Sequence, residues 1–370
     1  MQEHKPYYCR IGEVLIKIHN TNNLTSLVIK DLGPGLEETQ AEPDIELIID
    51  DSQVHTHYAP KIYSAKGSMN FTESEFFVGY LNELDYSVQN LFNDVSTVVR
   101  IDKEKRNIKK TVKSLYKGKL NIEKDQILSY ALFWYIMHLS LLKKGSAFIH
   151  AGVLNSKNGA TIITGTGGCG KTSTLFKILE NTEYSYIAED FGIVDKNGIT
   201  YYNPKPVSVY ASDTEFGQTI LRDHVATSPI WEKILWKVKR RIFRQNPMKK
   251  IPPEDLLKGR VSKQARVSQI LYLIRNNDSE IAWEEVTSSE LAERVLDASM
   301  RELKTLNELL LLMRANAPES FLIPSFHEIR EETRRVYSRA FDTADKKIVY
   351  IPHKTAPADL TKYLHENRLI

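Results

Sequence analysis

A single glycine-rich stretch constrains this chain more than any other feature. Residues 165–172 read GTGGCGKT, which matches the G-x-x-x-x-G-K-[ST] pattern of a phosphate-binding loop. The β-branched run at residues 160–164 predicts a buried strand before the loop, and residues 173–179 predict the beginning of a helix after it. Strand, loop and helix therefore follow one another in the order that phosphate binding requires.

The residue types of the loop explain how it would hold a nucleotide. Glycines tolerate positive φ, and N–H groups at a helix N-terminus direct partial positive charge at an anion. We expect Lys171 to reach the β- and γ-phosphates of ATP and Thr172 to ligate Mg²⁺. The expected contacts are Gly165, Thr166, Gly167, Gly168, Cys169, Gly170, Lys171, Thr172 and Ser173. The alternative is a glycine-rich turn that binds nothing.

Two acids follow the loop after one predicted helix. Residues 184–188 are a short apolar run that ends in Glu189 and Asp190. A strand–helix–strand unit of this length is expected to place its second strand directly beside the first, with the acids next to the loop. An acid there either accepts the proton of an incoming hydroxyl or holds the metal. The alternative is a surface pair of acids that opens a turn.

In these motifs the chain resembles the catalytic domain of HPr kinase/phosphorylase and its relatives. The matching segments are HAGVL at residues 150–154, the loop GTGGCGKT and AED at residues 188–190, and the resemblance covers about residues 125–225. It implies the nucleotide-binding fold shared with ATP-dependent phosphoenolpyruvate carboxykinase. It also implies that Glu189 is the general base for the substrate hydroxyl and that Asp190 supports the metal and the phosphates. By the same resemblance, Thr172 binds Mg²⁺ and His150 lies near the transferred phosphate. The alternative for His150 is a neutral imidazole packed on the sheet.

The sequence also departs from the family pattern. Glu189 replaces an Asp, Ser173 stands where the bifunctional enzymes carry a Glu, and the later loop associated with phosphorolysis is not recognisable. We therefore expect a kinase-like relative that acts on a serine-like hydroxyl of a protein, peptide or small molecule. Two alternatives stay open, namely a regulatory protein that binds ATP without transferring phosphate and a carboxykinase-type enzyme. Members of the family are often oligomers, so the resemblance also suggests a homo-oligomer.

The rest of the chain predicts an α/β protein that is α+β overall. A β-rich accessory domain is expected at residues 1–118, ending in a basic linker, and the catalytic domain at residues 119–370. The strands expected in the first domain include Val14–Ile18, Leu27–Ile29, Ile45–Ile49 and Glu75–Val78. The catalytic domain is expected to contain a hairpin around the Asn-Gly at 197–198, strands at 207–210, 265–274 and 347–351, and helices at 290–314, 328–341 and 359–367.

Composition narrows the class of protein. A net charge of +3 is too small to indicate nucleic-acid binding by itself. The two cysteines, Cys9 and Cys169, make no disulfide framework, and Cys169 lies inside the loop, which favours a reducing, cytoplasmic setting. The apolar run at residues 125–142 is shorter than the roughly 20 residues of a membrane span, so it predicts a buried helix and no transmembrane segment.

The basic residues are concentrated in an expected helical insert at residues 230–260. Within it, residues 231–250 have apolar side chains at helical spacing and a basic opposite face. Three interpretations stay open: a solvated surface helix, a clamp for an acidic substrate or partner, and contact with an anionic membrane or nucleic acid. Arg260, Arg266 and Arg275 are the candidates for a transition-state arginine. Lys205 is left outside the predicted site.

Overall fold

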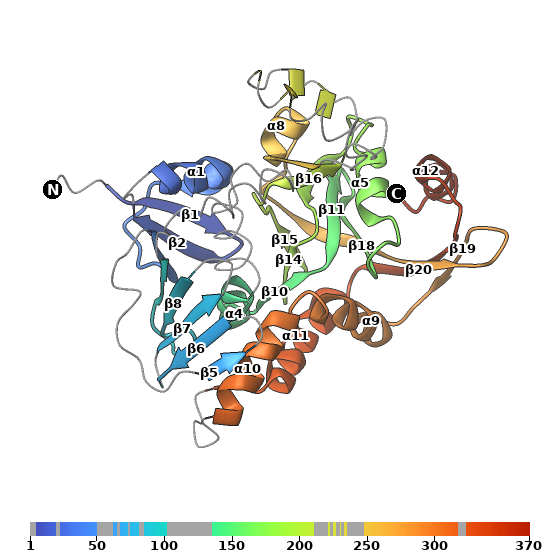
Figure 1. The fold of residues 1–370 in the computed structure, drawn as a ribbon. Coiled ribbons are helices and arrows are strands. Elements are labelled where there is room, and N and C mark those ends of the chain that lie inside the picture. Colours follow the sequence, from blue (N-terminus) through green and yellow to red (C-terminus); the bar gives the residue numbers. More distant parts are fainter. Residues whose placement is uncertain are drawn as a thin grey trace. The chain divides into compact units, whose positions relative to one another are not determined.

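The computed structural model describes residues 5–19, 23–49, 62–64, 67–72, 75–80, 85–101, 135–210, 248–316 and 323–370, with a few single positions between 221 and 234. In these parts the chain is a mixed α/β protein with two large sheets, in agreement with the predicted α+β class (Figure 1). It divides into two compact units, Met1–Ala147 with Met300–Thr333 and Phe148–Ser299 with Arg334–Ile370. The predicted boundary at residue 118 and the basic linker lie outside the described residues.

The first unit contains a mixed sheet whose two central pairings are parallel. In spatial order its strands are β3 (Leu36–Glu37), β1 (Tyr7–Ile11), β2 (Val14–His19), β4 (Ile45–Ile49), β9 (Thr97–Ile101), β8 (Asp85–Gln89), β7 (Glu75–Tyr80), β6 (Gly67–Phe71) and β5 (Ile62–Ser64). Strands β2, β4 and β9 pair in parallel. Buried and half-buried residues alternate along β4 and β9, so one face of the sheet covers the core.

The predicted strand at Leu27–Ile29 is wrong. These residues lie in α1 (Asn23–Leu32), which is followed by the 3-10 turn η1 (Gly33–Gly35). The fully buried residues of α1 are Thr25, Val28 and Leu32. Spacings of three and four place these side chains on one face of a helix, and three consecutive apolar residues could not distinguish that pattern from a short strand.

The second unit is built on a sheet that contains the phosphate-loop strand, β12 (Gly159–Gly165). The order is β10 (Ser146–Ile149), β14 (Gly192–Asp195), β15 (Ile199–Tyr201), β18 (Gln264–Asn276), β12, β11 (Ala151–Ser156) and β13 (Ser185–Ala188). The long strand β18 also pairs with β20 (Asp345–Pro352), which pairs with β19 (Ala282–Glu285). The expected hairpin around Asn197-Gly198 is confirmed as β14–β15.

The acid-bearing strand β13 does not lie beside β12, as the sequence predicted. Strand β11 lies between them and is antiparallel to both. The reason is that β11 and β12 form a tight hairpin, so the edge of β12 that β13 would have taken is already paired. Strands β12 and β13 nevertheless run in the same direction, and their carboxyl ends lie at the same edge of the sheet.

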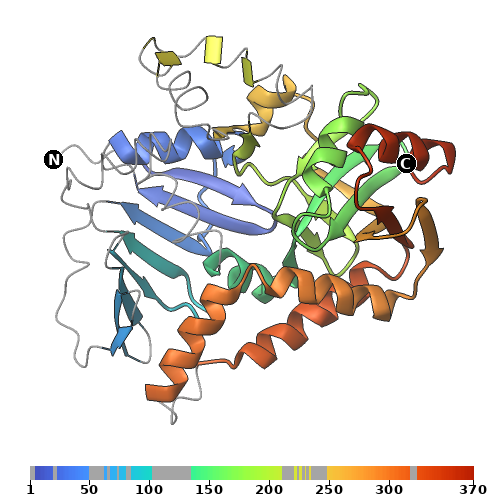
Figure 2. The same ribbon diagram turned by 45° about the vertical axis from the view of Figure 1, so that its right-hand side comes forward.

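Two helices of the second unit pack against each other close to the loop. Helix α5 (Lys171–Ile178) follows the loop, and α12 (Pro357–Glu366) packs against it (Figure 2). The helix predicted over 290–314 is interrupted, because α9 (Ser288–Met300) ends before α10 (Lys304–Asn316) begins. Helix α9 belongs to the second unit and α10 to the first, so each contributes its apolar face to a different core. Helix α11 (Phe326–Ala340) confirms the predicted helix at 328–341.

Most of the predicted basic insert lies outside the described residues. The end of the expected helix is wrong, because Met248–Ile251 forms strand β17, which pairs with β16 (Val207–Tyr210). The short helix α8 (Pro253–Leu257) follows it. Helix α4 (Ile136–Lys143) is the described part of the predicted apolar helix. Within the described ranges, no helix is long and apolar enough to cross a membrane.

We expect the stability of the first unit to fall at acidic pH because of His138 on α4. Its Nε2 lies 3.1 Å from the Thr333 hydroxyl, which itself donates to the Ile329 carbonyl, so Nε2 is assigned as the donor. Burial lowers the pKa of His138 to about 3. The unfolded chain, with a pKa near 6.5, therefore takes up the proton first, and stability is lost as pH falls from about 6.5 toward 3.

The expected loss from His138 is about 1.4 kcal/mol per pH unit below 6.5. Urea unfolding at about pH 7.5 and pH 5 measures it, with hydrogen exchange of α4 used to follow the first unit. The variant His138→Gln removes the titrating group and should show a smaller difference between the two pH values, by about 2 kcal/mol. An equal difference in both proteins would contradict the assignment.

Candidate active site

The glycine-rich loop joins β12 to α5 through a backbone that few residues other than glycine adopt. Gly165, Gly168 and Gly170 have φ of 142°, 81° and 102°. A Cβ atom on Gly165 would lie 2.5 Å from the Leu273 carbonyl oxygen of β18, whereas one on Gly167 or Gly168 would meet no atom within 4 Å. The loop is therefore packed closely at its beginning and open at its crest, where an anion has room to approach.

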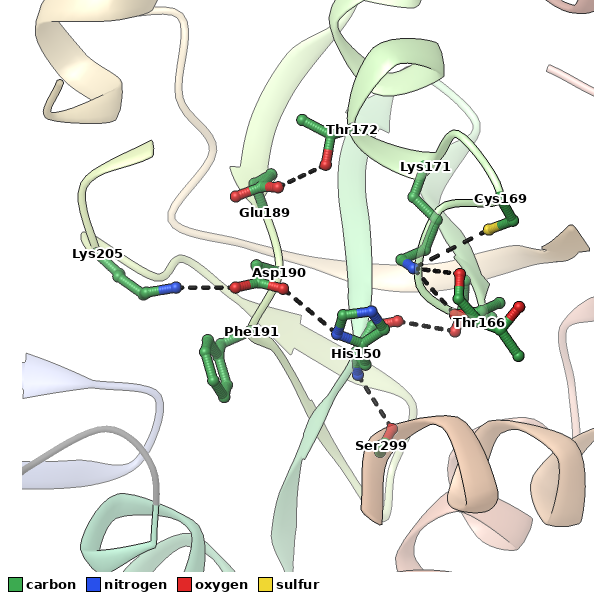
Figure 3. Close-up of polar contacts among 12 residues, drawn as sticks. His150, Thr166, Cys169, Lys171, Thr172, Glu189, Asp190, Phe191, Lys205 and Ser299 are labelled. Atoms are coloured by element: carbon green, nitrogen blue, oxygen red, sulfur yellow. Dashed lines mark hydrogen bonds and ion pairs between the residues drawn. The ribbon is translucent and has the colours of Figure 1, made fainter. Parts of the chain in front are cut away.

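The side chain of Lys171 turns back into the loop. Its Nζ donates to the carbonyl oxygens of Gly165, at 2.9 Å, and Thr166, at 3.1 Å (Figure 3). The residue is buried, at 8% exposure, so these carbonyls compensate the loss of water around the ammonium group. Cys169 is a free, buried thiol whose pKa is raised by burial. The loop therefore holds one fixed cation among its backbone groups.

Thr172 and Glu189 meet at the N-terminus of α5. The Thr172 hydroxyl donates to Glu189 Oε1 at 2.6 Å, a short bond of the kind that a carboxylate acceptor gives. A hydroxyl that gives its proton to a carboxylate presents its lone pairs on the other side, where a hard cation can bind. The structure thus brings together Thr172, in the first turn of α5, and Glu189, which follows the end of β13.

Asp190 adopts a backbone conformation that is rare for a non-glycine residue. Its φ is 69°, and the Phe191 N–H donates to the Glu189 carbonyl at 2.8 Å, which closes a three-residue turn around it. A residue with this geometry stores about 1–3 kcal/mol of strain and persists only where its surroundings hold it. The turn directs the two consecutive carboxylates to different partners.

The partners of Asp190 are the ammonium group of Lys205 and the imidazole of His150. Lys205 Nζ lies 3.0 Å from Asp190 Oδ2, and His150 Nδ1 lies 3.3 Å from Asp190 Oδ1. Lys205 also lies over the Phe191 ring, with its Nζ 4.4 Å from the ring centroid. Buried Asn203 fixes this segment, because its Nδ2 donates to the Phe191 carbonyl at 2.7 Å and its Oδ1 accepts from the Lys205 N–H at 3.0 Å.

These contacts give the two neighbouring acids different electrostatic environments. Burial and the adjacent charge of Asp190 raise the pKa of Glu189. Burial also disfavours the ionised form of Asp190, but Lys205 and His150 outweigh it and hold the pKa of Asp190 well below its ordinary range. Asp190 is therefore a fixed negative charge, and Glu189 is the more basic carboxylate of the pair.

His150 lies at the break between β10 and β11. Its main chain is fixed, since its N–H donates to Ser299 Oγ at 3.0 Å and its carbonyl accepts from Thr164 Oγ1 at 2.9 Å. The ring is nine-tenths buried; Nδ1 faces Asp190, whereas Nε2 has no polar partner among the described residues. Thr164 immediately precedes the loop, so an unsatisfied imidazole nitrogen lies at the loop's beginning.

These features fit a nucleotide and Mg²⁺. The open crest of the loop, the cation of Lys171 and the unpartnered Nε2 of His150 are suited to phosphate oxygens. In the described ranges no cluster of three or more His, Cys, Asp and Glu residues is arranged to hold a metal. Mg²⁺ is commonly held by one or two protein oxygens together with substrate phosphates, and the Thr172 hydroxyl is an oxygen of this kind.

The three arginines proposed for the transition state make other contacts. Arg260 donates to the carbonyls of Leu179, Asn181 and Tyr184 near the end of α5. Arg266 donates to the Asn197 carbonyl of the β14–β15 hairpin. Arg275 donates to the Cys169 carbonyl from behind the loop.

The charged residue that sequence reasoning missed is Lys205, for which the fixed Asn-Pro-Lys-Pro segment at 203–206 was the available signal.

Comparison with protein-family models and with curated proteins identified no relative. No protein-family model matches the chain, and no curated protein is significantly similar to it. The function is therefore inferred from the geometry of the site.

Proposed function

We propose that this protein is an ATP-dependent phosphotransferase with an HPr-kinase-like P-loop domain. The observation that carries the proposal is the meeting of the Thr172 hydroxyl with Glu189 at 2.6 Å, immediately after a loop that contains the Lys171 ammonium group. Three elements of phosphoryl transfer, namely a phosphate cradle, a metal-binding hydroxyl and a carboxylate, thus occur at one edge of the sheet.

Each residue has a role that follows from its contacts. The loop backbone and Lys171 hold the β- and γ-phosphates, and Thr172 holds Mg²⁺, which neutralises phosphate charge during transfer. Glu189 Oε1 is engaged by Thr172, whereas Oε2 has no hydrogen bond to any described residue and is available to the acceptor hydroxyl. Both oxygens of Asp190 already have partners, Lys205 and His150, so we assign proton removal to Glu189 and not to Asp190.

Asp190 and its partners then shape the environment of the transferred group. Lys205 balances the charge of Asp190, and the pair fixes the strained turn that directs Glu189 toward Thr172. His150 is held on the opposite side of Asp190, with its second nitrogen available to a phosphate oxygen. The acceptor is a serine-like hydroxyl of a protein, peptide or small molecule, and a homo-oligomer remains part of the proposal.

Transfer from γ-labelled ATP tests the function. The protein is incubated with Mg²⁺, labelled ATP and an extract of the cells from which it comes. We expect label on a discrete acceptor, and we expect Lys171→Met to reduce its transfer by about 10²- to 10³-fold. The matched control is Lys177→Met on the same helix, where the side chain is paired with Glu180 away from the loop.

Two results separate this function from its alternative. Binding of ATP by the wild-type protein with neither transfer nor hydrolysis would reject the kinase and favour a nucleotide-sensing regulator. Equal transfer by wild type, Lys171→Met and Lys177→Met would show that the loop is not the nucleotide site.

A further inference from the structure

Arg275, near the end of β18, connects the phosphate loop to the segment between β20 and α12. Its Nε donates to the Cys169 carbonyl of the loop at 3.3 Å. Its Nη1 donates to the carbonyls of Pro352 at 3.1 Å, His353 at 2.7 Å and Thr355 at 3.2 Å, and its Nη2 donates to Thr355 at 3.3 Å. One guanidinium group therefore joins four backbone carbonyls from two distant parts of the chain.

The same guanidinium lies directly behind the residue that starts α5. A Cβ atom on Gly170, the N-cap of α5, would lie 3.2 Å from Arg275 Nη2. The Cys169 carbonyl and the backbone of Gly170 thus lie against a rigid planar group. Because each donor of a guanidinium has a fixed direction, these bonds specify the position of the loop as well as adding charge near it.

We infer that Arg275 is a positioning residue for nucleotide binding and that residues 352–355 complete the phosphate site from behind. The inference rests on the proposed function, since it assumes that the loop binds the phosphates of ATP. Arg275 acts through the loop: the bonds to residues 352–355 hold the guanidinium, the guanidinium holds Cys169, and the loop glycines then have one arrangement in which to receive phosphate. Its hydrogen bonds within the described structure are all to backbone carbonyls, so it is not assigned the role of a transition-state arginine.

Calorimetric titration with Mg·ADP and with pyrophosphate tests the inference, because each titration gives the affinity and the fraction of competent sites separately. We expect Arg275→Gln to weaken both affinities by about 10- to 100-fold, since it removes the charge-assisted bonds that join the loop to residues 352–355. The fraction of competent sites and the transfer rate at saturating ATP should stay within about twofold of wild type, because no group that meets the substrate is lost.

Two further variants define the mechanism. Arg275→Lys keeps the positive charge but lacks the planar fork, so we expect an intermediate loss of about 3- to 10-fold. Arg266→Gln is the matched control, because it removes the same residue type from the same strand at an exposed position. Within the described structure the Arg266 side chain donates only to the Asn197 carbonyl, so the affinities of this variant should equal those of wild type.

The remaining outcomes each overturn the inference. Full affinity in Arg275→Lys would show that charge alone matters. Unchanged affinity in Arg275→Gln, or fewer competent sites with unchanged affinity, would show that Arg275 only stabilises the fold. If the wild-type protein bound neither Mg·ATP nor Mg·ADP, the proposed function would fail and this inference with it, whereas wild-type binding together with any of the first three results would reject the inference alone.

Discussion

Gly165→Ala is expected to disable the phosphate loop and to destabilise the second unit. The added Cβ would lie 2.5 Å from the Leu273 carbonyl oxygen and 3.0 Å from Cys169 Sγ, and the backbone φ of 142° is strained for any L side chain. Leu273 lies in β18 and is paired with β12 on one side and β20 on the other, so its carbonyl has no freedom to withdraw. Strain and overpacking together should cost about 2–5 kcal/mol.

The loop itself will move before the sheet does. Displacement of Gly165 moves the carbonyl that accepts from Lys171, so we expect the affinity for Mg·ATP to fall by at least about 100-fold, as for other losses of a charge-assisted network. Urea unfolding and calorimetric titration measure the two effects. Because the folded fraction is known from the unfolding curve, a loss of affinity is not mistaken for a loss of protein.

Gly167→Ala is the matched control within the same loop. Its Cβ would meet no atom within 4 Å, and its φ is not in the left-handed region. Its stability should stay within about 0.5 kcal/mol of wild type. If both alanine variants were equally stable, the close packing of the loop on β18 would be wrong.

The contrast between these glycines shows what the sequence could and could not predict. The strand, loop and helix over 159–178 were predictable, because β-branched residues, glycines and the helix start are local signals. The need for glycine at 165 in particular was not, since it depends on Leu273, far away in the sequence. The same holds for the position of β13, because a local strand–helix–strand rule cannot know that β11 already occupies the edge of β12.

The site was predictable to the same extent. Lys171, Thr172, Glu189 and Asp190 follow from motif spacing, and the structure brings Thr172 and Glu189 into contact. The different roles of the two acids could not be predicted from motif spacing, because they depend on Lys205. The rigid segment 203–206 brings the Lys205 side chain back to Asp190. Arg275 was visible only as one of three arginines, and its attachment to Cys169 spans 106 positions of the chain.

Glu189→Gln is expected to reduce phosphoryl transfer by about 10²- to 10⁴-fold, the usual contribution of a general base. Glutamine keeps a carbonyl oxygen that can accept from the Thr172 hydroxyl at the position of Oε1, so the metal-binding side of the site is preserved. It removes the basic oxygen that faces the acceptor. We therefore expect the affinity for Mg·ATP to change by less than about tenfold, because the lost interaction is made with the acceptor in the transition state.

The control variant and the results that would contradict the assignment are both judged by measuring the affinity for Mg·ATP and the transfer rate separately. Glu183→Gln alters an exposed glutamate just before the same strand, and both its affinity and its transfer rate should match those of wild type. Asp190→Asn should behave differently from Glu189→Gln, because it leaves Lys205 without its carboxylate partner and relaxes the strained turn, which affects affinity as well as rate. Normal transfer by Glu189→Gln with strongly reduced transfer by Asp190→Asn would show that Asp190, and not Glu189, accepts the proton. A loss of Mg·ATP affinity in Glu189→Gln as large as its loss of transfer would make Glu189 a ligand of the metal, since a proton acceptor acts only once the nucleotide is bound.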